Sequence, residues 1–158
     1  MDARMDLFGN EVATRYFKRL AATNQPLTEA GLSPTTMELV KLRASQINGC
    51  GVCTDMHYKD AIAAGEDPVR LNMVAAWREA TVFTEAERAA LELAEQGTRI
   101  ADAAGGVPDD VWRAAEKHFD EEQLGALVAV ISLINVYNRF NVIIQQPAGF
   151  YQPGMKFG

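Results

Sequence analysis

Cysteine and histidine are scarce in this chain: its 158 residues contain two of each. So few cysteines exclude a disulfide scaffold, in which several cross-links stand in for a large hydrophobic core. A chain of this length can bury roughly 70% of the surface that its unfolded form exposes, so it needs neither disulfides nor a structural metal to fold. We expect a single domain over residues 1–158.

Positive charge is also in short supply. The chain has 15 lysines and arginines against 21 aspartates and glutamates, which gives a formal net charge of −6. Because binding to a phosphate backbone requires a clustered excess of basic residues, no nucleic acid is expected as a partner. The composition, 48% hydrophobic and 23% charged, is that of an ordinary soluble globular protein.

Long hydrophobic runs and a signal sequence are missing as well. The longest apolar run, LVAVISLINVY at residues 127–137, is well short of the roughly 20 residues that a membrane span requires. The N-terminal MDARMDLFGNE is interrupted by acidic residues. We therefore expect a cytoplasmic protein with no membrane partner. In that reducing compartment, two neighbouring cysteines are typical of catalysis or metal binding rather than of a permanent disulfide.

Apolar residues recur at helical spacing in nearly every long segment, and neither a convincing β alternation nor an internal repeat is present. Capping residues, prolines and glycines divide the chain into about seven helices. These helices are expected to begin near residues 11, 34, 50, 68, 85, 108 and 121, with a loop over residues 26–31 after the first. The fold class predicted is an all-α helical bundle.

The longest predicted helix covers residues 121 to about 145. Asp120 and Gln123 form a capping box at its start. The helix is apolar around much of its circumference, so we expect it at the centre of the bundle. Four polar residues interrupt it, and we expect them to hydrogen-bond to one another or to nearby backbone: Ser132, Asn135, Asn138 and Arg139.

The C-terminal residues 147–158, PAGFYQPGMKFG, predict an irregular tail. Exposure of its aromatic side chains to water would be unfavourable, so these side chains are expected to dock on another subunit: Phe150, Tyr151 and Phe157.

Both cysteines and one of the two histidines fall in one short stretch, NGCGVCTDMHYKDAIAAG at residues 48–65. Residues three and four positions apart share a face of a helix, so Cys50, Cys53 and His57 line one stripe, each a turn from the next. Two sulfurs at this spacing can approach to disulfide distance with a slight adjustment of the first helical turn. The pattern favours thiol redox chemistry.

Two agents compete to ionise a thiol here, and they act on different sulfurs. The N-terminus of the helix favours a thiolate on Cys50, whereas His57 favours Cys53 by acting as its base. If the Asn-Gly pair at 48–49 reverses the chain, Glu38 lies opposite His57 and can orient it, as the acid does in a catalytic triad. We predict these roles: Cys53 nucleophile, His57 base, Glu38 orienting acid and Cys50 resolving thiol.

The order Glu38, eleven residues, Cys50, two residues, Cys53, three residues, His57 resembles the signature of the alkylhydroperoxidase D-like (AhpD-like) family, within the carboxymuconolactone decarboxylase superfamily. The segments LVKLRASQINGCGVC at 39–53 and LINVYNRF at 133–140 also look like that family. The resemblance covers roughly residues 15–145.

This resemblance implies an AhpD-like helical fold, a trimeric or hexameric homo-oligomer, no metal or other cofactor, and a peroxidase or disulfide reductase activity. In such family members the second cysteine reacts with peroxide, forms a sulfenic acid and is resolved by the first. The implied substrate is an organic hydroperoxide, and an unidentified dithiol or protein donates electrons. Some active relatives carry a histidine between the two cysteines where this chain has Val52, so a proton relay at that position is absent here.

Three alternatives remain open. A zinc ion could be held by four ligands, Glu38, Cys50, Cys53 and His57, although the second Cys or His pair of more usual sites is missing. A non-redox enzyme acting on a small lactone would match other branches of the superfamily, which generally lack the paired cysteines. An oxidant-sensing assembly protein would fit the extensive apolar helix and the aromatic tail.

Overall fold

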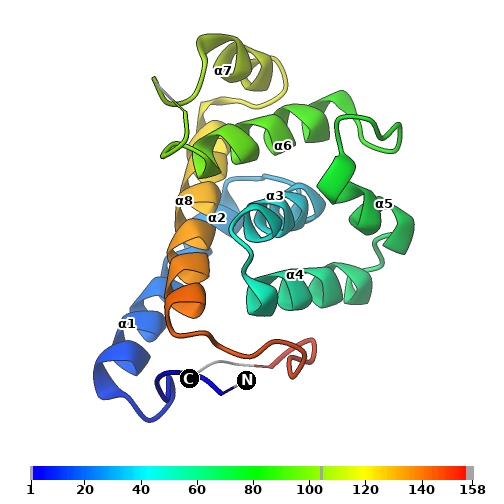
Figure 1. Cartoon of the computed structure of the whole chain (residues 1–158). Coiled ribbons are helices and arrows are strands. Elements are labelled where there is room, and N and C mark those ends of the chain that lie inside the picture. Colours follow the sequence, from blue (N-terminus) through cyan, green and yellow to red (C-terminus); the bar gives the residue numbers. More distant parts are fainter. Residues whose placement is uncertain (1, 104, 156–158) are drawn as a thin grey trace.

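The protein is described by a computed structural model over residues 2–103 and 105–155 (Figure 1). These two stretches form eight α-helices and one short 3-10 helix, and contain no β-strand. The elements are α1 (Glu11–Ala22), α2 (Asn24–Glu29), α3 (Pro34–Ile47), α4 (Gly51–Ala63), α5 (Pro68–Met73), η1 (Val74–Ala76), α6 (Glu85–Thr98), α7 (Asp109–Glu116) and α8 (Glu121–Ile143). The predicted all-α bundle is confirmed.

Seven of the α-helices begin within one residue of the predicted positions, and α2 occupies a segment predicted to be a loop. Pro26 is the third residue of α2. Backbone N–H groups in the first turn of a helix have no acceptor within that helix, so the donor that proline lacks is not missed there. The predicted loop is therefore wrong up to Glu29, and Gly31, with φ of +71°, follows the helix.

α8 is the central helix, as predicted, and it contacts α2, α3, α4, α6 and α7 (Figure 1). Its capping box is present, with the Asp120 side chain accepting the Gln123 backbone N–H over 2.8 Å. Leu127 is fully buried in the largest apolar cluster, together with Val40 of α3 and Ala94 of α6. α3, α6 and α8 thus pack against one another through this cluster, which fixes the position of α8 relative to α3.

By length and composition, α8 is the one helix within the described residues that passes as a candidate membrane span. In its most apolar 18-residue window, 44% is buried inside the fold. One side of α8 packs against five other helices, and its other side keeps exposed apolar residues, among them Val128, Val142 and Ile143. The absence of a membrane partner stays a prediction.

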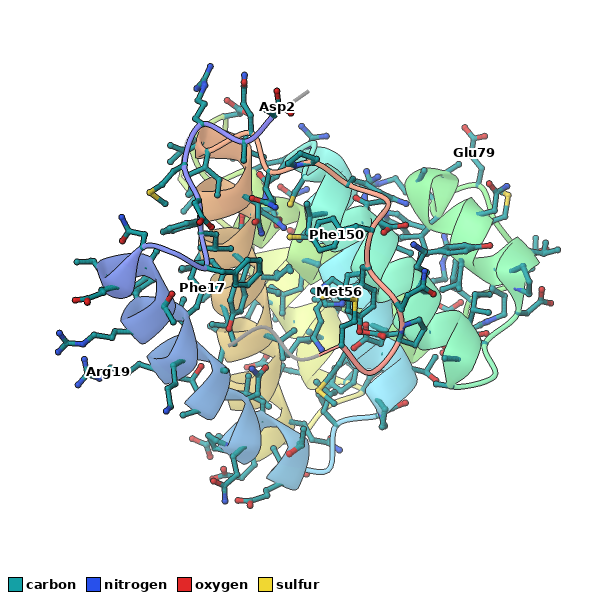
Figure 2. All side chains as sticks on the ribbon, turned by 90° about the horizontal axis from the view of Figure 1, so that it is seen from below. Asp2, Phe17, Arg19, Met56, Glu79 and Phe150 are labelled. Atoms are coloured by element: carbon teal, nitrogen blue, oxygen red, sulfur yellow. The ribbon has the colours of Figure 1, made fainter. Side chains whose placement is uncertain are left out.

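The C-terminal tail has no regular structure over residues 147–155, as predicted, and it crosses the face that also carries Phe17 and Met56 (Figure 2). Tyr151 is 4% exposed, and its Oη donates to Asp60 Oδ1 of α4 over 2.7 Å. The predicted docking on another subunit is therefore wrong for Tyr151, which packs on its own chain. A sequence pattern cannot distinguish these two ways of covering an aromatic ring. Phe157 lies outside the described residues.

Candidate active site

The two cysteines lie where α4 begins, directly after the turn that separates it from α3. Gly49 has φ of +65°, in the left-handed region that glycine enters at little cost, and the chain reverses there as predicted. Cys50 is the N-cap of α4, and its Sγ accepts the backbone N–H of Cys53 over 3.4 Å. This cap puts the Cys50 sulfur at the positive end of the helix.

The two sulfurs are close neighbours in a buried place. Cys50 and Cys53 are free cysteines, each 1% exposed, with their Sγ atoms 2.7 Å apart. A disulfide bond is about 2.0 Å long, so a shift of less than about 1 Å would close one. The predicted approach of the two thiols at the first turn is confirmed.

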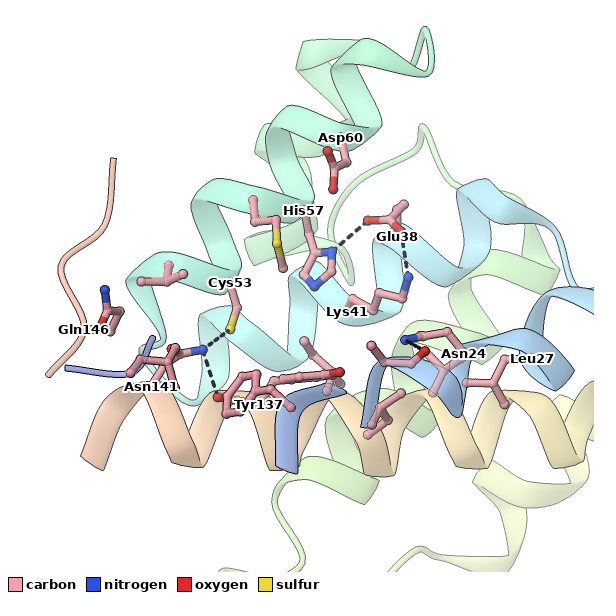
Figure 3. Close-up of a pocket in the computed structure, with 18 of the residues that line it drawn as sticks. Asn24, Leu27, Glu38, Lys41, Cys53, His57, Asp60, Tyr137, Asn141 and Gln146 are labelled. Atoms are coloured by element: carbon pink, nitrogen blue, oxygen red, sulfur yellow. Dashed lines mark hydrogen bonds and ion pairs between the residues drawn. The ribbon is translucent and has the colours of Figure 1, made fainter. Parts of the chain in front are cut away.

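His57 and Glu38 meet across the contact between α4 and α3 (Figure 3). His57 Nδ1 lies 2.9 Å from Glu38 Oε2, and Lys41 Nζ donates to Glu38 Oε1 over 2.8 Å. Burial raises the pKa of the Glu38 carboxyl, but the hydrogen bonds and charges of His57 and Lys41 outweigh burial and hold this pKa at about 2. Glu38 is therefore a carboxylate at neutral pH, and it fixes the imidazole through Nδ1.

In the described part of the chain, no direct hydrogen bond links His57 to a thiol. Within the described residues, no hydrogen bond joins its ring to the sulfur of Cys53, although both side chains line the same cavity (Figure 3). The polar neighbours of the Cys53 sulfur are the sulfur of Cys50 and the side-chain amide of Asn141, whose Nδ2 donates over 3.5 Å. In this geometry His57 can exchange a proton with Cys53 only through a molecule that occupies the cavity.

The two thiols ionise as a pair. The hydrogen bond between the two side chains lowers the pKa of the Cys50 thiol against the effect of burial, and the Cys53 backbone N–H lowers it further. The same shared hydrogen bond, followed by burial, raises the pKa of the Cys53 thiol. When one of the two thiols ionises, the charge is therefore favoured on Cys50, at the helix N-terminus, over Cys53.

Amides from α8 complete the surroundings of the sulfurs. Asn48 Nδ2 donates to Asn135 Oδ1 and to Asn138 Oδ1, both over 2.9 Å, and Asn138 Nδ2 donates to Ser45 Oγ over 3.1 Å. The Asn138 amide also lowers the pKa of each thiol. Sequence analysis missed both Asn138 and Asn141 as site residues. The signal was their i, i+3 spacing, which places them on one face of α8.

The prediction that the polar residues of α8 bond to one another or to nearby backbone is confirmed for Ser132, Asn135 and Arg139 and is wrong for Asn138, whose partners are the side chains of Asn48 and Ser45. Ser132 Oγ donates to the carbonyl of Val128, and Arg139 Nη1 donates to the side-chain and backbone oxygens of Asn135. The tertiary structure adds partners from α3 and its C-cap to this set.

A cavity of about 310 Å³ opens in front of Cys53 and His57 (Figure 3). Its walls are mainly apolar and include Leu7, Phe17, Leu27, Val130, Leu133 and Ile134. Glu38, Lys41 and Asn141 also line it, whereas Cys50 does not. A molecule in this cavity therefore meets the sulfur of Cys53 before that of Cys50.

Within residues 2–103 and 105–155, no group of three or more His, Cys, Asp or Glu side chains is arranged to hold a metal ion. The two Glu38 oxygens face His57 and Lys41. The four residues of the zinc alternative therefore lie near one another without converging on one point.

The chain is similar in sequence to one family of known proteins. The sequence model of the carboxymuconolactone decarboxylase family matches residues 14–96. The uncharacterized protein YdfG of Bacillus subtilis (strain 168) is 38% identical over 132 residues, which cover 84% of this chain and 88% of YdfG.

Two solved structures share the fold. ATU0492 from Agrobacterium tumefaciens, a protein of unknown function described as a candidate antioxidant defence protein AhpD, is 33% identical with a TM-score of 0.86, and the match covers 95% of this chain and 100% of that one. The alkylhydroperoxidase AhpD core of an uncharacterized peroxidase-related protein from Ralstonia eutropha JMP134 is 18% identical with a TM-score of 0.73, over 86% and 72% of the two chains. At that identity, the second likeness concerns the fold alone.

Proposed function

The chain belongs to the carboxymuconolactone decarboxylase family and is AhpD-like within it, and from this premise we propose that it is a thiol-dependent peroxidase for organic hydroperoxides. Family and structural relatives support a peroxidase-related role. One observation carries the finer proposal: two free thiols lie 2.7 Å apart, and one of them, Cys53, faces an apolar cavity beside His57.

The first step charges the sulfur that the substrate meets. When the shared proton moves from Cys53 to Cys50 across the 2.7 Å between them, the negative charge passes to Cys53. No further proton has to leave the pair. The transfer uses the charge that the N-terminus of α4 stabilises on Cys50, and it leaves Cys50 protonated for the later step.

The reaction then proceeds in two redox steps. The Cys53 thiolate attacks the terminal oxygen of the hydroperoxide, an S–O bond forms, the O–O bond breaks, and Cys53 is oxidised to a sulfenic acid. The alkoxide released takes a proton from His57, which Glu38 orients and which holds the proton that the thiol pair gave up on ionising. Cys50 next attacks the sulfur of the sulfenic acid, so that a disulfide forms and water leaves. A dithiol, small or protein-bound, must then reduce this disulfide.

The cavity favours hydroperoxides with an apolar body. Its volume of about 310 Å³ far exceeds what the peroxide group alone fills, and most of its wall residues are hydrocarbon side chains.

We also propose that the chain acts as a cytoplasmic homo-oligomer, trimeric or hexameric.

Stopped-flow thiol consumption with cumene hydroperoxide tests the proposal. The wild-type protein should lose two thiols and form an internal disulfide. Cys53→Ser should not react, whereas Cys50→Ser should lose one thiol and hold a sulfenic acid that dimedone traps. The two variants serve as matched controls, because each removes one of two equally buried sulfurs.

Two results would overturn these assignments. Thiols that persist at high hydroperoxide concentration would reject the peroxidase. A reactive Cys53→Ser together with an inert Cys50→Ser would make Cys50 the nucleophile, in agreement with its lowered pKa.

A further inference from the structure

We propose that Asn141 is a catalytic residue of this thiol reaction, donating a hydrogen bond to the Cys53 sulfur as that sulfur carries negative charge. The inference rests on the proposed function, and it concerns a residue on α8 that lies 88 positions from Cys53 in the chain.

The Asn141 amide is held in place and aimed at the sulfur. Nδ2 lies 3.5 Å from Cys53 Sγ and 3.1 Å from the backbone carbonyl of Tyr137, one turn back on the same helix (Figure 3). A side-chain amide has two N–H donors, so one can anchor the group to Tyr137 while the other faces the sulfur. The residue is 8% exposed and lines the cavity. It therefore touches the reacting atom without a change of conformation.

A donor is needed at this point because the surroundings do not favour charge. Cys53 is 1% exposed, and burial and the neighbouring Cys50 both work against a thiolate there. The hydrogen bond from Asn141 acts in the opposite direction and lowers the pKa of the Cys53 thiol, as does the nearby Asn138 amide. Asn138 itself is fixed by Asn48 and Ser45.

An amide suits this role better than an acid or a base would. It is neutral and does not ionise near neutral pH, and it can therefore stabilise the thiolate without competing for the proton shared by the two sulfurs. During attack on the hydroperoxide the N–H is not transferred. Electrons pass from sulfur to the peroxide oxygen, and the leaving alkoxide receives its proton from elsewhere.

The test uses the Cys50→Ser protein, in which Cys53 is the single thiol. The rate of alkylation by iodoacetamide, measured from pH 5 to 10, reports the ionisation of that thiol without any peroxide. Adding Asn141→Leu should move the midpoint to higher pH and slow alkylation at pH 7 about tenfold or more, as expected for loss of a hydrogen bond to a charged group. Asn141→Asp, which keeps the shape and replaces the donor by a negative charge, should move it further.

Gln96→Leu is the control. It removes a half-buried side-chain amide of α6 that donates to Glu92 Oε1 instead of to sulfur and does not line the cavity. The alkylation midpoint should stay unchanged in this control. If Gln96→Leu shifts it as much as Asn141→Leu does, the effect is not specific to the hydrogen bond to sulfur and the proposal is wrong.

A second measurement keeps Asn141 in place, so it does not depend on whether the Asn141 variants fold. In the Cys50→Ser protein, the side-chain ¹⁵N–¹H resonance of Asn141 should titrate with the same midpoint as alkylation. A resonance that ignores the thiol, or an unchanged midpoint in the Asn141 variants, overturns the inference. If the midpoints move as expected but no form consumes hydroperoxide, the hydrogen bond stands and the proposed peroxidase fails.

Discussion

Replacing Glu38 by glutamine should destabilise the fold in a pH-dependent way. The carboxylate accepts from Lys41 and pairs with His57 over 2.8 and 2.9 Å, and its side chain is 21% exposed. Glutamine keeps the size and one carbonyl oxygen, but it has no charge to offer either partner. The substitution therefore isolates the electrostatic part of this contact between α3 and α4.

The magnitude follows from the shifted ionisation. The pKa of the Glu38 carboxyl falls from its ordinary value of 4.5 to about 2 in the folded chain. At about 1.4 kcal/mol for each pKa unit, the carboxylate stabilises the folded state by about 3 kcal/mol at pH 7 relative to an uncharged group. Because the pKa is lower in the folded than in the unfolded chain, this contribution is complete above about pH 5 and is lost as the pH falls towards 2. At pH 3 less than about half of it remains.

Urea unfolding at pH 7, 4.5 and 3 measures this effect. The free energy of unfolding of Glu38→Gln should lie about 3 kcal/mol below that of the wild-type protein at pH 7, and the gap should shrink to about 1.4 kcal/mol at pH 3. Glu29→Gln is the control, because Glu29 is an exposed acid at the end of α2 that accepts from Gln25 in the same helix. Equal stability of wild type and Glu38→Gln at pH 7, or a gap of constant size down to pH 3, would refute the reasoning.

Two further substitutions test contacts that hold the site together. Asn48→Ala removes the amide that donates to Asn135 and Asn138, so urea unfolding should show a loss of about 1–3 kcal/mol, because the buried Asn138 oxygen loses its donor while the Asn135 oxygen keeps the one from Arg139. A loss below about 0.5 kcal/mol would show that these oxygens find other donors. Tyr151→Phe removes the hydrogen bond to Asp60 and should cost about 1 kcal/mol while raising amide hydrogen exchange in the tail. Unchanged exchange there would mean that packing alone holds the tail.

The sequence determined those features of the protein that depend on neighbours along the chain. Helix periods and caps act over three to seven residues, so the seven predicted helices begin almost where expected. The stripe of Cys50, Cys53 and His57 follows from the same local geometry. Even the position of Glu38 opposite His57 could be predicted. The short turn at Gly49 forces the two helices to run antiparallel side by side, and this brings the two residues together.

Helix α2 shows the limit of this local reasoning. Proline is a strong helix breaker in the middle of a helix and harmless in the first turn. The position of Pro26 within α2 depends on where the helix begins, and α2 is held by packing, with Leu27 buried in the largest apolar cluster beside α8. No local pattern around residue 26 reports on that distant partner.

Only the tertiary structure decided which groups surround the sulfurs. Asn141 and Asn138 reach the thiols from a helix that begins some seventy residues later in the chain, and their spacing by itself also fits a polar patch with no function. The choice of Cys53 as the sulfur that lines the cavity, and the return of Tyr151 onto Asp60, likewise depend on how α8 and the tail pack on α4. Contacts of this kind follow from the shapes of whole surfaces brought together on folding, and no spacing along the sequence encodes them.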